Sequence, residues 1–106
     1  MRHRGNFSVG EREFRARLTQ IVSQKVFIKA GIVKMVRRCG KVNCRCAQGE
    51  GHQSHYLSMR EGTKRKMIYI PASMEKDVRE WVKNYKGIQE AIDRISEYRL
   101  QQIRQG

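Results

Sequence analysis

The chain has 106 residues, with 23 Lys and Arg against 10 Asp and Glu, and a formal net charge of +13 at pH 7. A chain of this length forms one domain with a small hydrophobic core, so we expect residues 1–106 to be a single domain. No stretch approaches the roughly 20 apolar residues of a membrane span. The basic N-terminus is followed by no apolar segment, so we expect no signal peptide and an intracellular protein.

The positive charge is concentrated in the first two thirds of the chain. Residues 1–66 contain 16 Lys and Arg against 4 Asp and Glu, whereas residues 67–106 contain 7 against 6. Nucleic acid is the natural partner of such a surface, because each neutralised phosphate releases condensed counterions. The alternatives are an acidic protein surface, an anionic lipid, or charge that serves only solubility.

The N-terminal part predicts a short helix after a basic arm. Residues 1–10 contain little that folding would bury, so they are expected to be a flexible basic arm or an ordinary frayed terminus. Residues 11–25 then place apolar side chains at helical spacing, with acidic residues in the first turn. The apolar positions are Phe14, Leu18, Ile21 and Val22, and the opposite face carries Arg12, Arg15, Arg17 and Lys25.

The middle of the chain predicts a small three-stranded antiparallel sheet. Residues 32–38 are rich in branched side chains, and residues 55–60 and 64–70 are two further strands joined by Glu61-Gly62-Thr63. Tyr56 and Tyr69 are expected either to stack on bases or to pack on the C-terminal helix. The fold class is therefore α+β.

A long helix is predicted over residues 73–105. Pro71 ends the last strand, and Ser73 is the expected N-cap. Two seven-residue rows of apolar residues predict a coiled-coil seam that ends near Ile95, and Gly87 would allow a bend. The helix is expected to cover the sheet and the first helix, to pair with a second copy in a homodimer, or both. The rows are Val78, Tyr85 and Ile92, and Trp81, Ile88 and Ile95.

All three cysteines and two of the three histidines lie within residues 39–55, which predicts a zinc knuckle. Structural Zn²⁺ takes four sulfur or imidazole ligands in a tetrahedron. Three thiolates would carry the site, with His52 or His55 as the fourth ligand, and Lys41 and Arg45 would offset its negative charge. Free or redox-active thiols are the alternative. The expected zinc ligands are Cys39, Cys44, Cys46, and His52 (or His55).

The run from Cys39 to His52, followed by His55-Tyr56-Leu57-Ser58 and by residues 66–71, resembles an uncharacterised family of small prokaryotic and phage proteins. That family has the pattern CGKxNCxCAxGxxH, then an aromatic strand, a hairpin and a long helix opened by a proline. The resemblance covers roughly residues 31–90. It implies a cytoplasmic location in a prokaryotic or phage-infected cell and gives no activity.

The sequence contains no catalytic constellation, so we expect no enzyme; a small metal-dependent nuclease is the enzymatic alternative. The favoured hypothesis is a zinc-stapled nucleic-acid-binding module that acts as an accessory or regulatory factor, with DNA favoured over RNA. The other hypothesis is an adaptor or inhibitor that docks an acidic protein partner. The expected nucleic-acid contacts are Arg37, Arg38, Lys41, Arg45, Arg60, Lys64, Arg65 and Lys66.

The zinc hypothesis makes a prediction about stability. The substitution Cys44→Ser should lower the melting temperature substantially and abolish the effect of an added chelator, because the free energy of ligation is folding free energy in such sites. Thermal unfolding of parent and variant, with and without chelator, measures this. Equal melting temperatures would mean that the cysteines form no structural site.

Overall fold

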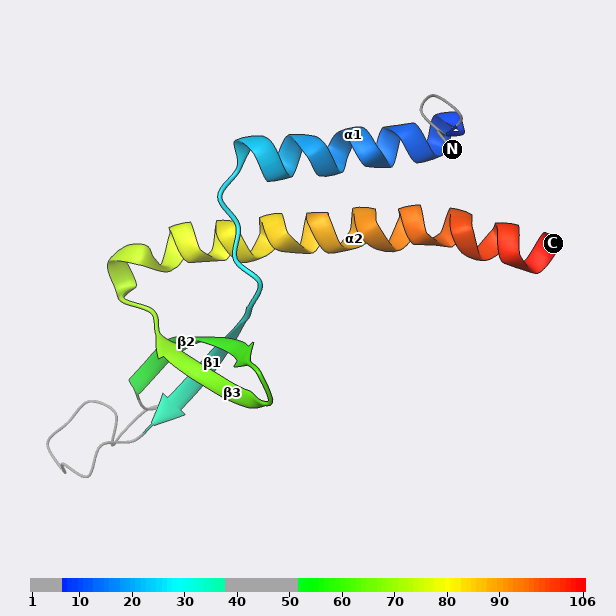
Figure 1. Cartoon of the computed structure of the whole chain (residues 1–106). Coiled ribbons are helices and arrows are strands. Elements are labelled where there is room, and N and C mark those ends of the chain that lie inside the picture. The colour runs from blue at the N-terminus through cyan, green and yellow to red at the C-terminus, as the bar shows by residue number, and fades with distance from the viewer. Residues whose placement is uncertain (1–6, 38–51) are drawn as a thin grey trace, which may run out of the picture. The chain divides into compact units, whose positions relative to one another are not determined.

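The computed structural model describes residues 7–37 and 52–106. Its elements in chain order are α1 (Val9–Gln24), β1 (Gly31–Arg37), β2 (His52–Glu61), β3 (Lys64–Tyr69), a 3-10 turn (Ala72–Met74) and α2 (Glu75–Gln105), shown in Figure 1. This confirms an α+β fold with an N-terminal helix, a three-stranded antiparallel sheet and a long C-terminal helix. The chain divides into two compact units: a sheet unit of residues 29–82, and a helical unit that contains α1 and the part of α2 from Lys83 onward.

The sheet has the order β1-β2-β3, with both pairs antiparallel. Glu61 pairs with Lys64, so the β2–β3 hairpin has the two-residue loop Gly62-Thr63. Gly62 has a φ of 65°, the only positive φ among the described residues, and glycine adopts this conformation without a Cβ clash. This glycine therefore fixes the register of β3 against β2.

The core of the sheet unit is small. Its buried hydrophobic residues come from the central strand, the residue that follows β3 and the first eight residues of α2, whereas every residue of β3 itself is exposed. The backbone N–H of Ile70 donates to the carbonyl of His55, which holds the chain against β2 as it leaves β3. The buried set is Leu57, Ile70, Val78 and Val82.

The entry into α2 differs from the prediction that Ser73 is its N-cap. Ser73 lies inside the 3-10 turn, and α2 begins only at Glu75. Pro71, with a φ of −60°, precedes this turn, and its carbonyl accepts from the N–H of Met74. The fixed φ of proline is already suited to such a turn, which is why the chain coils before the helix proper starts.

In the helical unit, α1 and α2 run antiparallel. The N-terminal turn of α1 contacts the C-terminal part of α2, because Arg99 Nη2 lies 2.6 Å from Glu11 Oε1. At the other end of α1, the Asn84 side chain donates to the carbonyl of Val26 at 2.8 Å. The N-cap of α1 is Ser8, whose Oγ accepts from the N–H of Glu11. The unit is thus an antiparallel pair of helices that are far apart in sequence (Figure 1).

Glu11 is the most deeply buried charged residue in the described chain, with 1% of its surface exposed. Both of its carboxylate oxygens are paired: Oε1 with Arg99, and Oε2 with Arg15 Nη2 at 3.0 Å. The guanidinium of Arg15 also lies over the ring of Phe7, 3.8 Å from its centroid, a cation–π geometry. The sequence indicated only a favourable helix-dipole position for Glu11. In the structure its carboxylate also joins α1 to α2 through the ion pair with Arg99.

The apolar rows of α2 are buried to different degrees within the chain. Ile88 and Ala91 are buried in the helical unit, with Ala91 only 1% exposed, whereas Ile92 is 43% exposed. The helix also continues through Gly87, where a Cβ would lie 3.0 Å from Ile21 Cδ1. Gly87 therefore provides room for a side chain of α1.

No helix in the described ranges is long and apolar enough to cross a membrane.

A close approach at Gly10 gives a second testable prediction. A Cβ at this position would overlap Tyr98 Oη, so Gly10→Ala should destabilise the protein by about 1–3 kcal/mol through overpacking. Adding Tyr98→Phe should recover most of this loss relative to Tyr98→Phe alone, because the next atom, Tyr98 Cζ, is 3.5 Å away. Chemical denaturation followed by circular dichroism measures the free energies of unfolding.

Gly31→Ala is the matched control, because a Cβ at Gly31 meets nothing within 4 Å. If Gly10→Ala and Gly31→Ala change stability equally, the close packing of α1 on α2 at Gly10 is contradicted.

Candidate nucleic-acid interface

Alternation of side chains along the strands divides the sheet into two faces. Tyr56 of β2 is the direct partner of Val33 in β1 and of Tyr69 in β3, whereas the next residue, Leu57, is the partner of Ile32 and Ile68. Successive side chains of a strand point to opposite faces. We define the tyrosine face by Val33, Tyr56, Arg60, Arg65, Met67 and Tyr69, and the leucine face by Ile32, Lys34, His55, Leu57, Lys66 and Ile68.

The two tyrosines form the centre of the tyrosine face. Their ring centroids are 5.7 Å apart with an interplanar angle of 71°, an edge-to-face contact. Tyr69 remains 55% exposed, and Met67 on the same strand and Val33 on the other side of Tyr56 are also exposed. The tyrosines thus contact each other, and Tyr69 is accessible to solvent.

Arginine provides the positive charge of the tyrosine face. Arg65 Nη1 donates to Ser58 Oγ at 2.6 Å, so its guanidinium lies across the central strand. Arg60 and Arg65 are direct cross-strand partners. No acidic residue of the described strands belongs to this face, since Glu61 alternates onto the other one. Arg60 and Arg65 are therefore cross-strand neighbours of like charge, an arrangement that destabilises a sheet unless an anion lies nearby.

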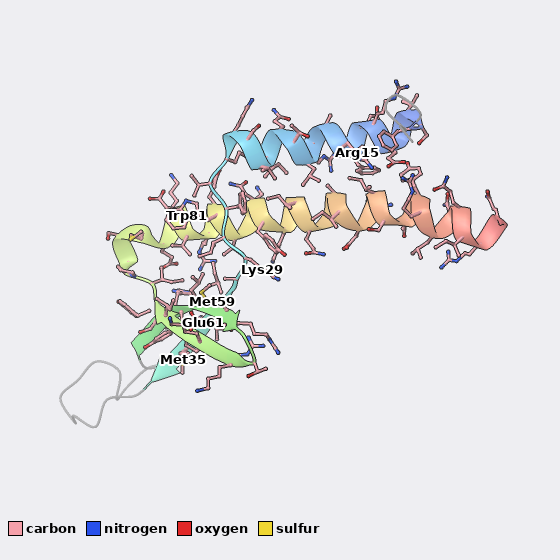
Figure 2. All side chains as sticks on the ribbon, viewed as in Figure 1. Arg15, Lys29, Met35, Met59, Glu61 and Trp81 are labelled. Carbon is pink, nitrogen blue, oxygen red and sulfur yellow. The ribbon has the colours of Figure 1, made fainter. Side chains whose placement is uncertain are left out.

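The leucine face carries lysines where the tyrosine face carries arginines, and it is contacted by α2. His55 Nδ1 lies 3.2 Å from Glu75 Oε2 in the first turn of α2, which places the start of that helix on this face. Its cations are lysines, and Lys66 Nζ is 3.7 Å from Glu61 Oε2. Met35 and Met59, labelled in Figure 2, belong to the tyrosine and leucine faces respectively. The sheet has one arginine- and tyrosine-bearing face, and one lysine-bearing face in contact with α2.

The structure separates the predicted nucleic-acid contacts. Lys64, Arg65 and Lys66 are all exposed, but Arg65 lies on the tyrosine face and the two lysines on the other. Arg60 joins Arg65, and Arg37 ends β1 as the partner of His52. The remaining predicted contacts lie outside the described residues: Arg38, Lys41 and Arg45.

The predicted zinc ligands fall mainly outside the part of the chain that the structure describes. Cys39, Cys44 and Cys46 belong to residues 38–51, and His52 is described only as the first position of β2. His55 has its Nδ1 against Glu75, with its side chain 19% exposed. Within residues 7–37 and 52–106 there is no group of three or more His, Cys, Asp or Glu that could hold a metal.

Two features of this surface were missed by the sequence analysis. One is the sorting of arginine and lysine onto opposite faces, which the two-residue alternation of β2 and β3 would have indicated once the register was fixed by Gly62. The other is the hydrogen bond that the exposed Arg65 donates to Ser58, a buried residue of β2. No local pattern indicates that bond, because it depends on which strand lies beside β3.

These features define a small α+β protein with a basic sheet that exposes aromatic side chains. Residues 11–80 match the family model described as "Domain of unknown function (DUF6788)". The match covers more than half of the chain, so the protein belongs to this family, in agreement with the predicted resemblance to an uncharacterised family. No curated protein and no solved structure matches the chain significantly.

Proposed function

We propose that the protein is a zinc-stapled nucleic-acid-binding module that acts as an accessory or regulatory factor, with DNA favoured over RNA. The observation that supports this best is the charge of the sheet. Its three strands contain six basic residues and one acidic residue, Glu61. The basic set is Lys34, Arg37, Arg60, Lys64, Arg65 and Lys66.

The exposure of these cations supports a polyanionic partner. Each residue of β3 is exposed, and Glu61 is within ion-pair distance of only Lys66 among the described basic residues of the strands. By contrast, α1 and α2 contain i to i+4 ion pairs of the ordinary helical kind, such as Arg15 with Glu11 and Arg79 with Glu75. Among the described residues, the positive charge of the strands is thus largely not balanced by acidic side chains, which favours a polyanionic partner.

The proposed zinc site is supported by the positions of the end of β1 and the start of β2. Arg37 pairs with His52, so the two residues that flank positions 38–51 lie at adjacent positions of the sheet. Three thiolates in such a short connection, together with His52 or His55, would close a tetrahedral Zn²⁺ site and hold the ends of both strands. A closed site of four protein ligands is structural, which agrees with a binding module and not an enzyme.

A second candidate function is an adaptor or inhibitor that docks a protein partner, or a homodimer formed through α2. It is favoured by the apolar residues that α2 leaves exposed near its C-terminal end, Ile92, Leu100 and Ile103. Contacts of this kind survive high salt, whereas phosphate contacts weaken steeply with salt. Retention of a partner in a high-salt pull-down would therefore favour the adaptor.

The proposed function predicts the effect of removing the basic cluster of β3. The triple variant Lys64→Ala, Arg65→Ala, Lys66→Ala should weaken binding to DNA and flatten its salt dependence, by about 0.9 in the slope of log K against log salt for each lost phosphate contact. Fluorescence anisotropy titrations over a series of salt concentrations measure both quantities.

The matched control is the triple variant Lys76→Ala, Lys83→Ala, Lys86→Ala, which removes three exposed cations from α2. It changes net charge equally and should alter affinity and slope much less. Unchanged affinity and slope in the β3 variant would contradict the proposed function, and so would equal effects of the two triple variants.

A further inference from the structure

We propose that the tyrosine face binds single-stranded nucleic acid, with Tyr69 stacking on an unpaired base and with Arg60 and Arg65 contacting phosphates. This inference rests on the proposed function, because it names the form of nucleic acid that the sheet takes. It concerns only described residues and does not depend on the metal.

Tyr69 is exposed to solvent and is held in place by its contact with Tyr56. The residue is 55% exposed, yet the edge-to-face contact of its ring with Tyr56 restrains its orientation. An aromatic ring held on a sheet surface in this way offers a stacking partner whose conformational entropy is already reduced. Every base has a π-face, but in a duplex the neighbouring base pairs cover it, so only an unpaired base can use this ring.

The second argument is the pairing of Arg60 with Arg65. These are direct partners on neighbouring strands, on a face that has no acidic residue among the described strand positions. A phosphate between or beside them would relieve the repulsion of two like charges. Guanidinium also donates in a planar fork that matches phosphate oxygens, which the ammonium group of lysine does not.

The third argument is the position of Arg65 relative to the tyrosines. Its hydrogen bond to Ser58 directs the guanidinium over β2, two residues along that strand from Tyr56. Tyr69 and Arg65 therefore lie on the same face, four residues apart in β3, and the guanidinium of Arg65 reaches toward β2. A chain of alternating bases and phosphates can use both at once, with the exposed Met67 between them on β3.

An acidic protein partner fits this face less well. Carboxylates would pair with the arginines, but they would gain nothing from the exposed tyrosine ring. A partner that recognised charge alone would also make no distinction between the arginine face and the lysines opposite it. The combination of an exposed aromatic side chain with guanidinium groups that make no ion pair among the described residues is what a single strand uses.

The test compares a fluorescein-labelled single-stranded oligonucleotide with the same strand annealed to its complement, using the full chain and fluorescence anisotropy. The single strand should bind about tenfold or more tightly than the duplex. Tyr69→Ala should weaken single-strand binding by about 5- to 150-fold, the range expected for loss of one stacked base, and should change duplex binding little. Tyr69→Phe should retain the affinity for the single strand.

A pair of neighbouring residues tests the face independently of the tyrosine. Arg65→Gln and Lys64→Gln remove the same charge from adjacent exposed positions on opposite faces. Arg65→Gln should weaken single-strand binding markedly more than Lys64→Gln does. This pair keeps the proposal falsifiable if Tyr69→Ala proves unable to fold, which circular dichroism would reveal.

The outcomes separate this inference from the proposed function. Duplex bound as tightly as single strand, or equal effects of Arg65→Gln and Lys64→Gln, would overturn the tyrosine-face proposal and leave a nucleic-acid-binding module. Unchanged single-strand binding by a folded Tyr69→Ala variant would do the same. Absence of binding to either oligonucleotide would overturn both.

Discussion

The alternation of side chains along β2 is the constraint that determines what the sheet can do. This strand is central, so its register with β1 and β3 decides which residues of all three strands share a face. A shift of one residue would exchange the faces completely. The observed register directs Leu57 into the small core and brings Tyr56 and Ser58 together with Tyr69 and Arg65. Core formation and the exposed aromatic face therefore follow from the same pairing.

The helical unit is held by a different kind of interaction. A chain with this much charge has few apolar residues for a helix–helix contact, and α1 buries a carboxylate where a hydrophobic residue would be usual. Glu11 is tolerated there because two guanidinium groups satisfy both of its oxygens. Two glycines also let the helices approach each other closely: Gly10 lies against Tyr98, and Gly87 lies against Ile21. Charge pairing and glycine contacts thus replace part of the core that the composition cannot provide.

The elements with local signals were predictable from the sequence, and the long-range contacts were not. Helical spacing from Phe14 to Val22 indicated α1, and the glycine between two runs of strand formers indicated the hairpin that Gly62 makes. The pairing of Glu11 with Arg99 spans 88 positions, and many other basic residues would have suited that carboxylate equally well. For the same reason the heptad rows did not indicate which of their residues would be buried within one chain, such as Ile88, and which would stay exposed, such as Ile92. The zinc site stays a prediction, because its cysteines lie outside the described residues.

The most direct test of the account is to find which residues touch a bound single strand. Ultraviolet crosslinking to an oligonucleotide that contains 5-bromouracil, followed by peptide mass spectrometry, reports aromatic side chains in contact with bases. The chain offers internal controls, because Tyr85 and Tyr98 belong to α2 and Tyr56 and Tyr69 to the sheet. The account predicts crosslinks at Tyr69, with or without Tyr56. Crosslinks confined to Tyr85, Tyr98 or Trp81 would contradict it.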